Sequence, residues 1–260
     1  MLIDTHIHLD AAEFDPDRRQ AIDAARGGGV AGFVVPAVER ANFDAVRDVA
    51  AANADACFAL GVHPMYVMPA RMEDIDVLDQ YLGQGGAVAV GEIGLDHFVP
   101  GIDHARQLDF FVAQLRLARR HGLPVILHVR RAIDPILKQL RRIGVPGGIA
   151  HAFNGSRQQA DALINLGFKL GFGGTLSFSG STRIRELAAT LPLDAIVLET
   201  DAPDIPPEWA RGQRNEPAHL PRYAEILAEL RGVTVGEITA ATGRNATEVL
   251  RWRPAQAVGA

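Results

Sequence analysis

Short apolar runs alternate with amphipathic segments along the chain, and this alternation limits the fold more than any other feature. Short apolar runs are typical of buried strands, whereas apolar positions repeated every three or four residues are typical of helices. The runs predict strands at residues 2–8, 32–36, 57–61, 87–92, 124–128, 148–152, 169–171 and 195–199. The segments between them predict helices at residues 17–26, 42–53, 74–82, 104–121, 133–143, 157–166, 182–191 and 218–231.

Eight strand–helix units in succession favour a TIM-type (β/α)8 barrel, an α/β fold. A chain of 260 residues can bury one large core, so we expect a single domain over residues 1–260. Residues 235–251 predict an additional C-terminal helix that packs against the outside. An open doubly wound sheet is the alternative. That fold usually carries a glycine-rich dinucleotide-binding fingerprint. The glycines of the segment Gly171-Phe172-Gly173-Gly174 are not followed by the later glycine or the ribose-binding acid of that fingerprint, so we predict a structural role for them.

Composition narrows the class of protein. Cys57 is the single cysteine, which rules out intramolecular disulfides and favours a reducing compartment. The net charge of −5 disfavours a protein that holds nucleic acid through a broad basic surface. No basic leader precedes the first apolar run, and no run is long enough for a membrane span. We expect a cytoplasmic protein with no membrane association and no obligate protein partner.

His6 and His8 lie two residues apart in the first predicted strand. Side chains at that spacing point to the same side of a strand, so both imidazoles can reach one metal ion. Four further candidate ligands close or follow later apolar runs: Glu92, His128, His151 and Asp201. In a strand–helix barrel the carboxyl ends of the strands form one active-site face, and the candidates therefore predict one convergent site.

Six nitrogen and oxygen ligands are more than one catalytic ion needs, since an open catalytic zinc takes about three protein ligands. We therefore expect two divalent ions, with Glu92 placed to bridge them. The ligand types suit zinc, manganese, iron(II), nickel or magnesium without distinguishing among them. Two ions about 3.5–4 Å apart can clamp a phosphate ester and an attacking metal-bound water. This predicts hydrolysis, with Glu92 and Asp201 as catalytic residues and Asp201 as the proton acceptor.

Six short motifs follow one another along the chain, and five of them contain these residues. They are DTHIH at 4–8, GVHP at 61–64, GEIGLD at 91–96, PVILHVR at 124–130, HAFNGS at 151–156 and LETDAP at 198–203. The set resembles the TatD-type metal-dependent deoxyribonucleases, which belong with the amidohydrolase-like barrels. Asn215-Glu216-Pro217 and Asn245 are similar to two later elements of that family. Departures from the family pattern occur at His97 and Val129, and neither removes a ligand.

The resemblance implies a barrel that binds two or three divalent ions and removes nucleotides from DNA, as a 3′–5′ exonuclease on single-stranded ends. It makes DNA the substrate partner and assigns metal ligation to the six residues above. It places His63 and Arg130 where a substrate phosphate binds, although His63 could equally be a turn residue ahead of Pro64. Asp96 is expected to orient a ligand from the second shell, or to cap the turn that follows it.

Two other functions remain open on the same residues. A metal-dependent amidase, esterase, lactonase or aminoacyl-ester hydrolase could use the same ligands, because a carbonyl carbon is attacked as readily as phosphorus. A metal-stabilised binding protein is the non-enzymatic alternative. Four arginines near predicted strand-end loops favour an anionic substrate: Arg130, Arg157, Arg183 and Arg214.

Overall fold

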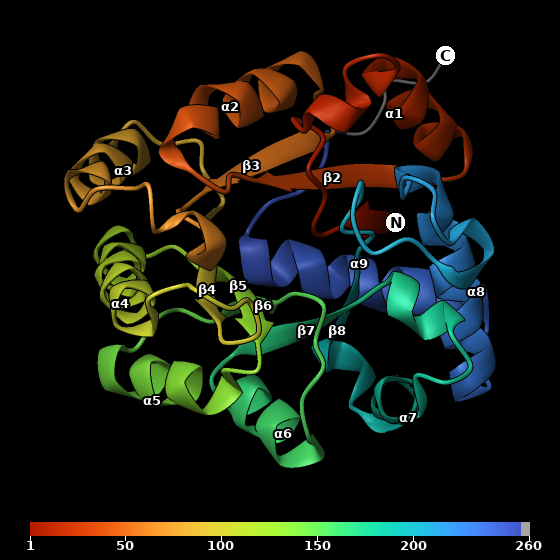
Figure 1. Ribbon diagram of the computed structural model, residues 1–260. Helices are drawn as coiled ribbons and strands as arrows, with labels where there is room; N and C mark the ends of the chain where they lie inside the picture. The colour runs from red at the N-terminus through yellow and green to blue at the C-terminus, as the bar shows by residue number, and fades with distance from the viewer. Residues whose placement is uncertain (256–260) are drawn as a thin grey trace.

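The computed structural model describes residues 1–255, so the last five residues of the predicted 1–260 domain lie outside the described part. Eight strands and nine α-helices alternate along it (Figure 1). The strands are β1 Leu2–Asp4, β2 Val30–Pro36, β3 Ala56–Leu60, β4 Ala89–Asp96, β5 Val125–Arg130, β6 Gly148–Ala150, β7 Phe168–Phe172 and β8 Ile196–Leu198. The α-helices are α1 Arg18–Gly27, α2 Phe43–Ala52, α3 Glu73–Gly83, α4 His104–His121, α5 Ile133–Ile143, α6 Arg157–Asn165, α7 Thr182–Thr190, α8 Leu220–Arg231 and α9 Val235–Leu250.

The strands form one parallel sheet in chain order from β1 to β8. Backbone hydrogen bonds join its two edges: the amide of Thr5 donates to the carbonyl of Leu198 (3.1 Å), and the amide of Asp201 donates to the carbonyl of His6 (2.8 Å). These bonds bring β8 back against β1 and nearly close the sheet. The predicted single-domain (β/α)8 barrel with an additional C-terminal helix is confirmed.

Helix α4 shows how sequence signals set the elements around the barrel. The Asp103 carboxylate caps its first turn by accepting hydrogen bonds from the amides of Ala105 (2.8 Å) and Arg106 (3.2 Å). Phe111 and Leu115 are buried on one stripe, and the helix ends at Gly122, whose φ of 66° is left-handed. None of the α-helices in residues 1–255 combines the length and apolarity needed to span a membrane.

The barrel interior holds a small apolar cluster that is separate from the main core. Its strand members are Ile3, Val34, Cys57, Ala59, Ala89, Ile126, Ile149 and Val197. Alternate strand positions belong instead to the main core, which also contains the buried faces of the surrounding helices. Because side chains two apart share a side of a strand, the interior positions Ile126 and Ile149 lead directly to His128 and His151.

Helix α9 packs across the amino ends of the strands, so the predicted packing against the outside of the barrel is wrong. Ala246 and Leu250 join the interior cluster, and α9 crosses the barrel in Figure 1. The Asn245 side chain donates to the carbonyls of Leu193 (2.8 Å) and Ile196 (2.7 Å), just before and at the start of β8. The amphipathic pattern of α9 specified a buried face but could not specify which apolar surface receives it.

Candidate metal centre

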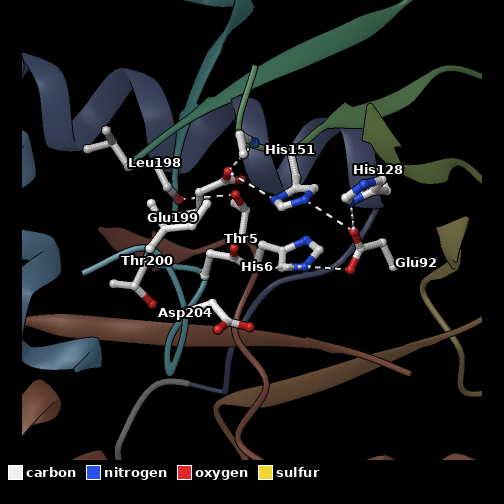
Figure 2. Close-up of polar contacts among 12 residues, drawn as sticks. Thr5, His6, Glu92, His128, His151, Leu198, Glu199, Thr200 and Asp204 are labelled. Atoms are coloured by element: carbon white, nitrogen blue, oxygen red, sulfur yellow. Dashed lines mark hydrogen bonds and ion pairs between the residues drawn. The ribbon is translucent and has the colours of Figure 1, made fainter. Parts of the chain in front are cut away.

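The six predicted ligands meet at the carboxyl ends of the strands. His6 and His8 follow β1, His151 follows β6 and Asp201 follows β8. Strands β4 and β5 run further than predicted, so Glu92 and His128 lie within them and not at their ends. Figure 2 shows the imidazoles of His6, His128 and His151 turned toward Glu92.

Glu92 lies at the middle of the cluster and is 2% exposed. Its Oε2 lies 3.0 Å from Nε2 of His6 and 3.7 Å from Nε2 of His8. Its Oε1 lies 3.0 Å from Nδ1 of His128 and 3.1 Å from Nε2 of His151. The two oxygens of one carboxylate therefore face two separate groups of imidazoles, and His63 is a third member of the Oε1 group (3.3 Å).

Asp201 completes the group around His6 and His8. Its Oδ1 lies 3.5 Å from Nε2 of His6 and 3.7 Å from Nε2 of His8. Its φ of 59° is left-handed, a strained conformation that is often found at functional sites. The buried Asn215 side chain fixes this loop by donating to the carbonyls of Thr200 (2.7 Å) and Asp204 (2.8 Å).

The donor set fits divalent metal ions. Within residues 1–255, Nδ1 of His6 and Oε2 of Glu199 are buried without a hydrogen-bond partner. Such atoms are costly to bury unless something else binds them. Three groups bring ligand atoms within 4.8 Å of one another: His6 with Glu92 and His151, His6 with His8 and Asp201, and His63 with Glu92 and His128.

Burial and mutual attraction shift the pKa values of these groups. Burial lowers the pKa of His6 to about 3, which leaves a neutral ring with a lone pair for a metal. Burial raises the pKa of Asp201 to about 7. For Glu92, burial acts upward, but the imidazoles of His63, His6 and His151 hold the pKa well below its ordinary value. The centre thus keeps a buried carboxylate ionised by surrounding it with imidazoles.

Comparison with known proteins identifies the family. Residues 3–251 match the family model described as TatD related DNase. This chain belongs to the TatD family. A relative from Escherichia coli K12 named an uncharacterized metal-dependent hydrolase, YjjV, is 40% identical over 94% of this chain and 95% of its own length. The crystal structure of the TatD homolog YjjV from Escherichia coli K12 superposes with a TM-score of 0.93 at 38% identity, covering 96% of this chain and 98% of that one.

A relative from Erwinia billingiae, named the 3′-5′ ssDNA/RNA exonuclease TatD, is 30% identical over 89% of this chain and 92% of its own length. The resemblance predicted from the six motifs is therefore confirmed, and the chain is a member of a family of metal-dependent hydrolases. A TatD family hydrolase from Entamoeba histolytica shares the fold of this chain. Its structure superposes with a TM-score of 0.83 at 19% identity, covering 95% of this chain and 97% of that one.

In this TatD-family chain, Asp96 makes contacts that suit both of the tasks considered for it. Its Oδ2 lies 3.1 Å from Nε2 of His128, the ring nitrogen that faces away from Glu92. Its Oδ1 accepts hydrogen bonds from the amides of Phe98 (2.8 Å) and Val99 (3.0 Å), which closes the turn after β4. The hydrogen bond to His128 fixes that ring with Nδ1 toward the cluster.

His63 lies inside the cluster, with Nε2 3.3 Å from Oε1 of Glu92. Its Nδ1 accepts a hydrogen bond from the amide of Met65 (3.1 Å) at the start of a 3-10 turn. A neutral imidazole has one donor and one acceptor nitrogen, so Nε2 carries the proton in this arrangement. The geometry therefore suits a hydrogen-bond donor better than a metal ligand, although His63 belongs to one of the three candidate ligand groups.

Glu199 is a site residue that the sequence analysis did not single out. It is 1% exposed, and its Oε1 lies 3.5 Å from Nδ1 of His151 and accepts a hydrogen bond from the amide of Ala152 (Figure 2). Carboxylates in this position orient metal-ligating histidines. The available signal was its position two residues after Val197, which continues the interior face of β8.

The four arginines expected near the site have different environments. Arg157 pairs with Asp161 (3.0 Å), and Arg214 pairs with Asp17 and Glu216 (2.7 Å each). Arg183 donates to the side chain of Asn154. Within residues 1–255, only Arg130 of the four has no hydrogen-bonded side-chain partner, so it is the one best placed to receive an anion.

Proposed function

We propose that this TatD-family hydrolase cleaves phosphodiester bonds of DNA and removes nucleotides from single-stranded ends in the 3′–5′ direction. The observation that carries the proposal is the Glu92 carboxylate, whose Oε2 faces His6 and His8 and whose Oε1 faces His63, His128 and His151 (3.0–3.7 Å). Residues on both sides of Glu92 could hold two divalent ions, which would stabilise the attacking and leaving oxygens of a phosphodiester. A relative named as a single-stranded nucleic acid exonuclease supports the substrate.

We assign the ions to six ligands: His6, His8, Glu92, His128, His151 and Asp201. Two ions match the two faces of Glu92, and a third would need the His63 group, whose ring already accepts a backbone hydrogen bond. When bound, divalent ions lower the pKa of a water toward neutrality and neutralise charge on a phosphate. The ligand types do not separate magnesium, manganese, zinc, nickel and iron(II).

The chain's own residues supply positioning and proton transfer. As the water oxygen bonds to phosphorus and the ester P–O bond breaks, Asp201 accepts the water proton and passes it to the departing ester oxygen. Arg130 binds a non-bridging phosphate oxygen through its guanidinium. We assign His63, whose donor nitrogen Nε2 lies 3.3 Å from Oε1 of Glu92, to substrate binding beside that carboxylate, and Asp96 keeps His128 oriented.

The same proposal covers the setting of the enzyme. We place it in the cytoplasm as one domain, because Cys57 is the single cysteine and lies buried inside the barrel. DNA is its substrate partner. With a net charge of −5, the protein relies on the local positive charge of bound ions, about four charges for two divalent ions, to hold a polyanion.

Removal and return of metal tests the function. The chelated protein should not cleave an end-labelled oligothymidylate, and magnesium, manganese or zinc should restore stepwise shortening from the 3′ end. Glu92→Gln, which removes the bridging charge and keeps the shape, should lower kcat/KM by at least about a thousandfold, or roughly 4 kcal/mol. A parallel panel of carboxylic esters and amides provides the comparison. Faster turnover of that panel than of DNA, or full activity in Glu92→Gln, would reject the proposal.

A further inference from the structure

Large apolar side chains that remain exposed gather in two loops at the mouth of the barrel. Among residues 1–255, five of the seven lie after β3 or β4, and the other two are Met1 and Val235. The five are Met65, Tyr66, Met68, Met72 and Phe98. Grouped apolar exposure on a soluble fold marks a binding surface more often than scattered exposure does.

The two loops are fixed against each other and against the metal centre. The buried Gln107 side chain accepts from the amide of Asp96 (3.1 Å) and donates to the carbonyl of Pro64 (3.2 Å). Arg106 donates to the carbonyl of Val67 (2.7 Å). Phe98 is bound through its amide to the Asp96 carboxylate, whose other oxygen contacts His128. The exposed ring of Phe98 therefore belongs to a rigid turn that begins at the metal centre.

Two guanidinium groups lie on this ring. The Cζ atoms of Arg130 and Arg131 are 3.7 Å and 4.6 Å from the ring centroid of Phe98, which is 44% exposed. Neither guanidinium has an ion-pair partner in the part of the chain that the structure describes. Arg131 has a left-handed φ of 56°, a strained conformation in the loop that follows β5. The cation–π contacts hold both groups against the ring, and their N–H groups can bind an anion.

We propose that Phe98, Arg130 and Arg131 form a stacking shelf for an unpaired nucleobase next to the phosphate that is cleaved. The inference rests on the proposed nuclease function and deepens it by assigning the residues that select single-stranded ends. A nucleobase stacks on an aromatic ring or a guanidinium plane, and its phosphate pairs with the guanidinium edges. A base inside a duplex is stacked on both faces, and the terminal base is stacked on one face and paired with the other strand, so a frayed or single-stranded end fits the shelf best.

The test compares two substrates on the metal-loaded enzyme. One is a 5′-labelled oligothymidylate, and the other is the same strand with abasic residues at its last two 3′ positions. The wild type should show a kcat/KM about tenfold higher on the base-bearing end, as expected from stacking energies of about 1–3 kcal/mol per base. Phe98→Ala should bring the ratio of the two kcat/KM values close to one. Phe98→Trp should retain the preference, whereas Phe98→Leu, which keeps apolar area without a π face, should lose it.

Val235→Ala is the matched control, because Val235 is also an exposed apolar residue (42%) but lies on α9. Its preference for the base-bearing end should equal that of the wild type. If the wild type shortens both strands equally well, or if Phe98→Ala and Phe98→Leu retain the preference, the shelf is wrong and the nuclease function stands. If the metal-loaded wild type shortens neither strand, the nuclease function is wrong and the shelf is rejected with it.

Discussion

Replacing Gly171 by alanine should displace Glu199 and weaken metal binding without touching a metal ligand. A Cβ atom at Gly171 would lie 2.1 Å from Oε2 and 2.6 Å from Cδ of Glu199. An ordinary carbon–oxygen contact is above 3 Å, so the carboxylate would have to move by about 1 Å or more. The backbone cannot yield easily, because β7 pairs with both β6 and β8 around this residue.

Two effects should follow from Gly171→Ala. Overpacking of a closed interior costs about 1–3 kcal/mol, so with about 2 kcal/mol lost the Tm of the metal-free protein should fall by about 4–8 °C. The displaced carboxylate can no longer hold Nδ1 of His151, and loss of such an orienting contact lowers metal affinity by about 10–100-fold. Differential scanning calorimetry of the metal-free protein and isothermal titration with manganese measure the two effects separately.

A matched control and a shape-preserving variant separate the causes. Gly180→Ala places a Cβ with no atom within 4 Å, so both its Tm and its manganese affinity should match the wild type. Glu199→Gln keeps the volume and removes the charge, so it should lose affinity with little overpacking. Wild-type manganese affinity in both Gly171→Ala and Glu199→Gln would refute the orienting role of Glu199.

Three further outcomes follow from individual contacts. His63→Ala should leave the number of bound ions unchanged in elemental analysis while His128→Ala lowers it, and a lower number for His63→Ala would identify His63 as a ligand. Asn245→Ala removes two side-chain hydrogen bonds, to the carbonyls of Leu193 and Ile196, while the Leu193 carbonyl keeps its bond from the Ile196 amide, so urea unfolding should show a loss of about 1–3 kcal/mol. For Asp74, burial acts upward, but hydrogen bonds from the Arg71 amide and the Arg40 guanidinium lower its pKa below the ordinary 3.8. Its stabilisation is therefore present above pH 4 and lost as the pH falls below that value, so Asp74→Asn should cost about 1–2 kcal/mol at pH 7 and less at pH 3.5 in urea unfolding.

Much of the fold could be predicted because the strand–helix alternation is encoded locally. The predicted helix at 104–121 agrees with α4. Its capping residue Asp103 and its terminal Gly122 directly precede and follow it in the sequence. The end of β4 was misjudged, because Gly91 and Gly94 interrupt the apolar run while the strand continues to Asp96. At Gly94 a Cβ would lie 1.9 Å from the carbonyl oxygen of His128, so this glycine permits close strand approach and does not end the strand.

The convergence of the ligands could be predicted for a topological reason. In a parallel barrel every strand runs toward the same face, so histidines and carboxylates in or just after the carboxyl-terminal halves of the strands converge there. The residues that support them are different, because a contact such as Glu199 with His151 depends on the relative height of β6 and β8, two strands apart in the sheet. The spacing of residues along the sequence does not determine how far β6 and β8 are shifted relative to each other along the barrel axis, so this contact could not be predicted.

The glycines at 171–174 show what this difference means for function. Read along the chain they are a weak glycine cluster, and a structural role was all that their spacing supported. In the barrel, the Glu199 carboxylate occupies the space that a side chain at Gly171 would fill. A Cβ at Gly173 would lie 2.4 Å from the Glu199 carbonyl oxygen. Glycine on β7 is therefore a condition for the carboxylate that follows β8 to reach a histidine after β6. The orientation of His151 thus depends on three strands, and a substitution on any of them should alter metal binding even where no ligand changes.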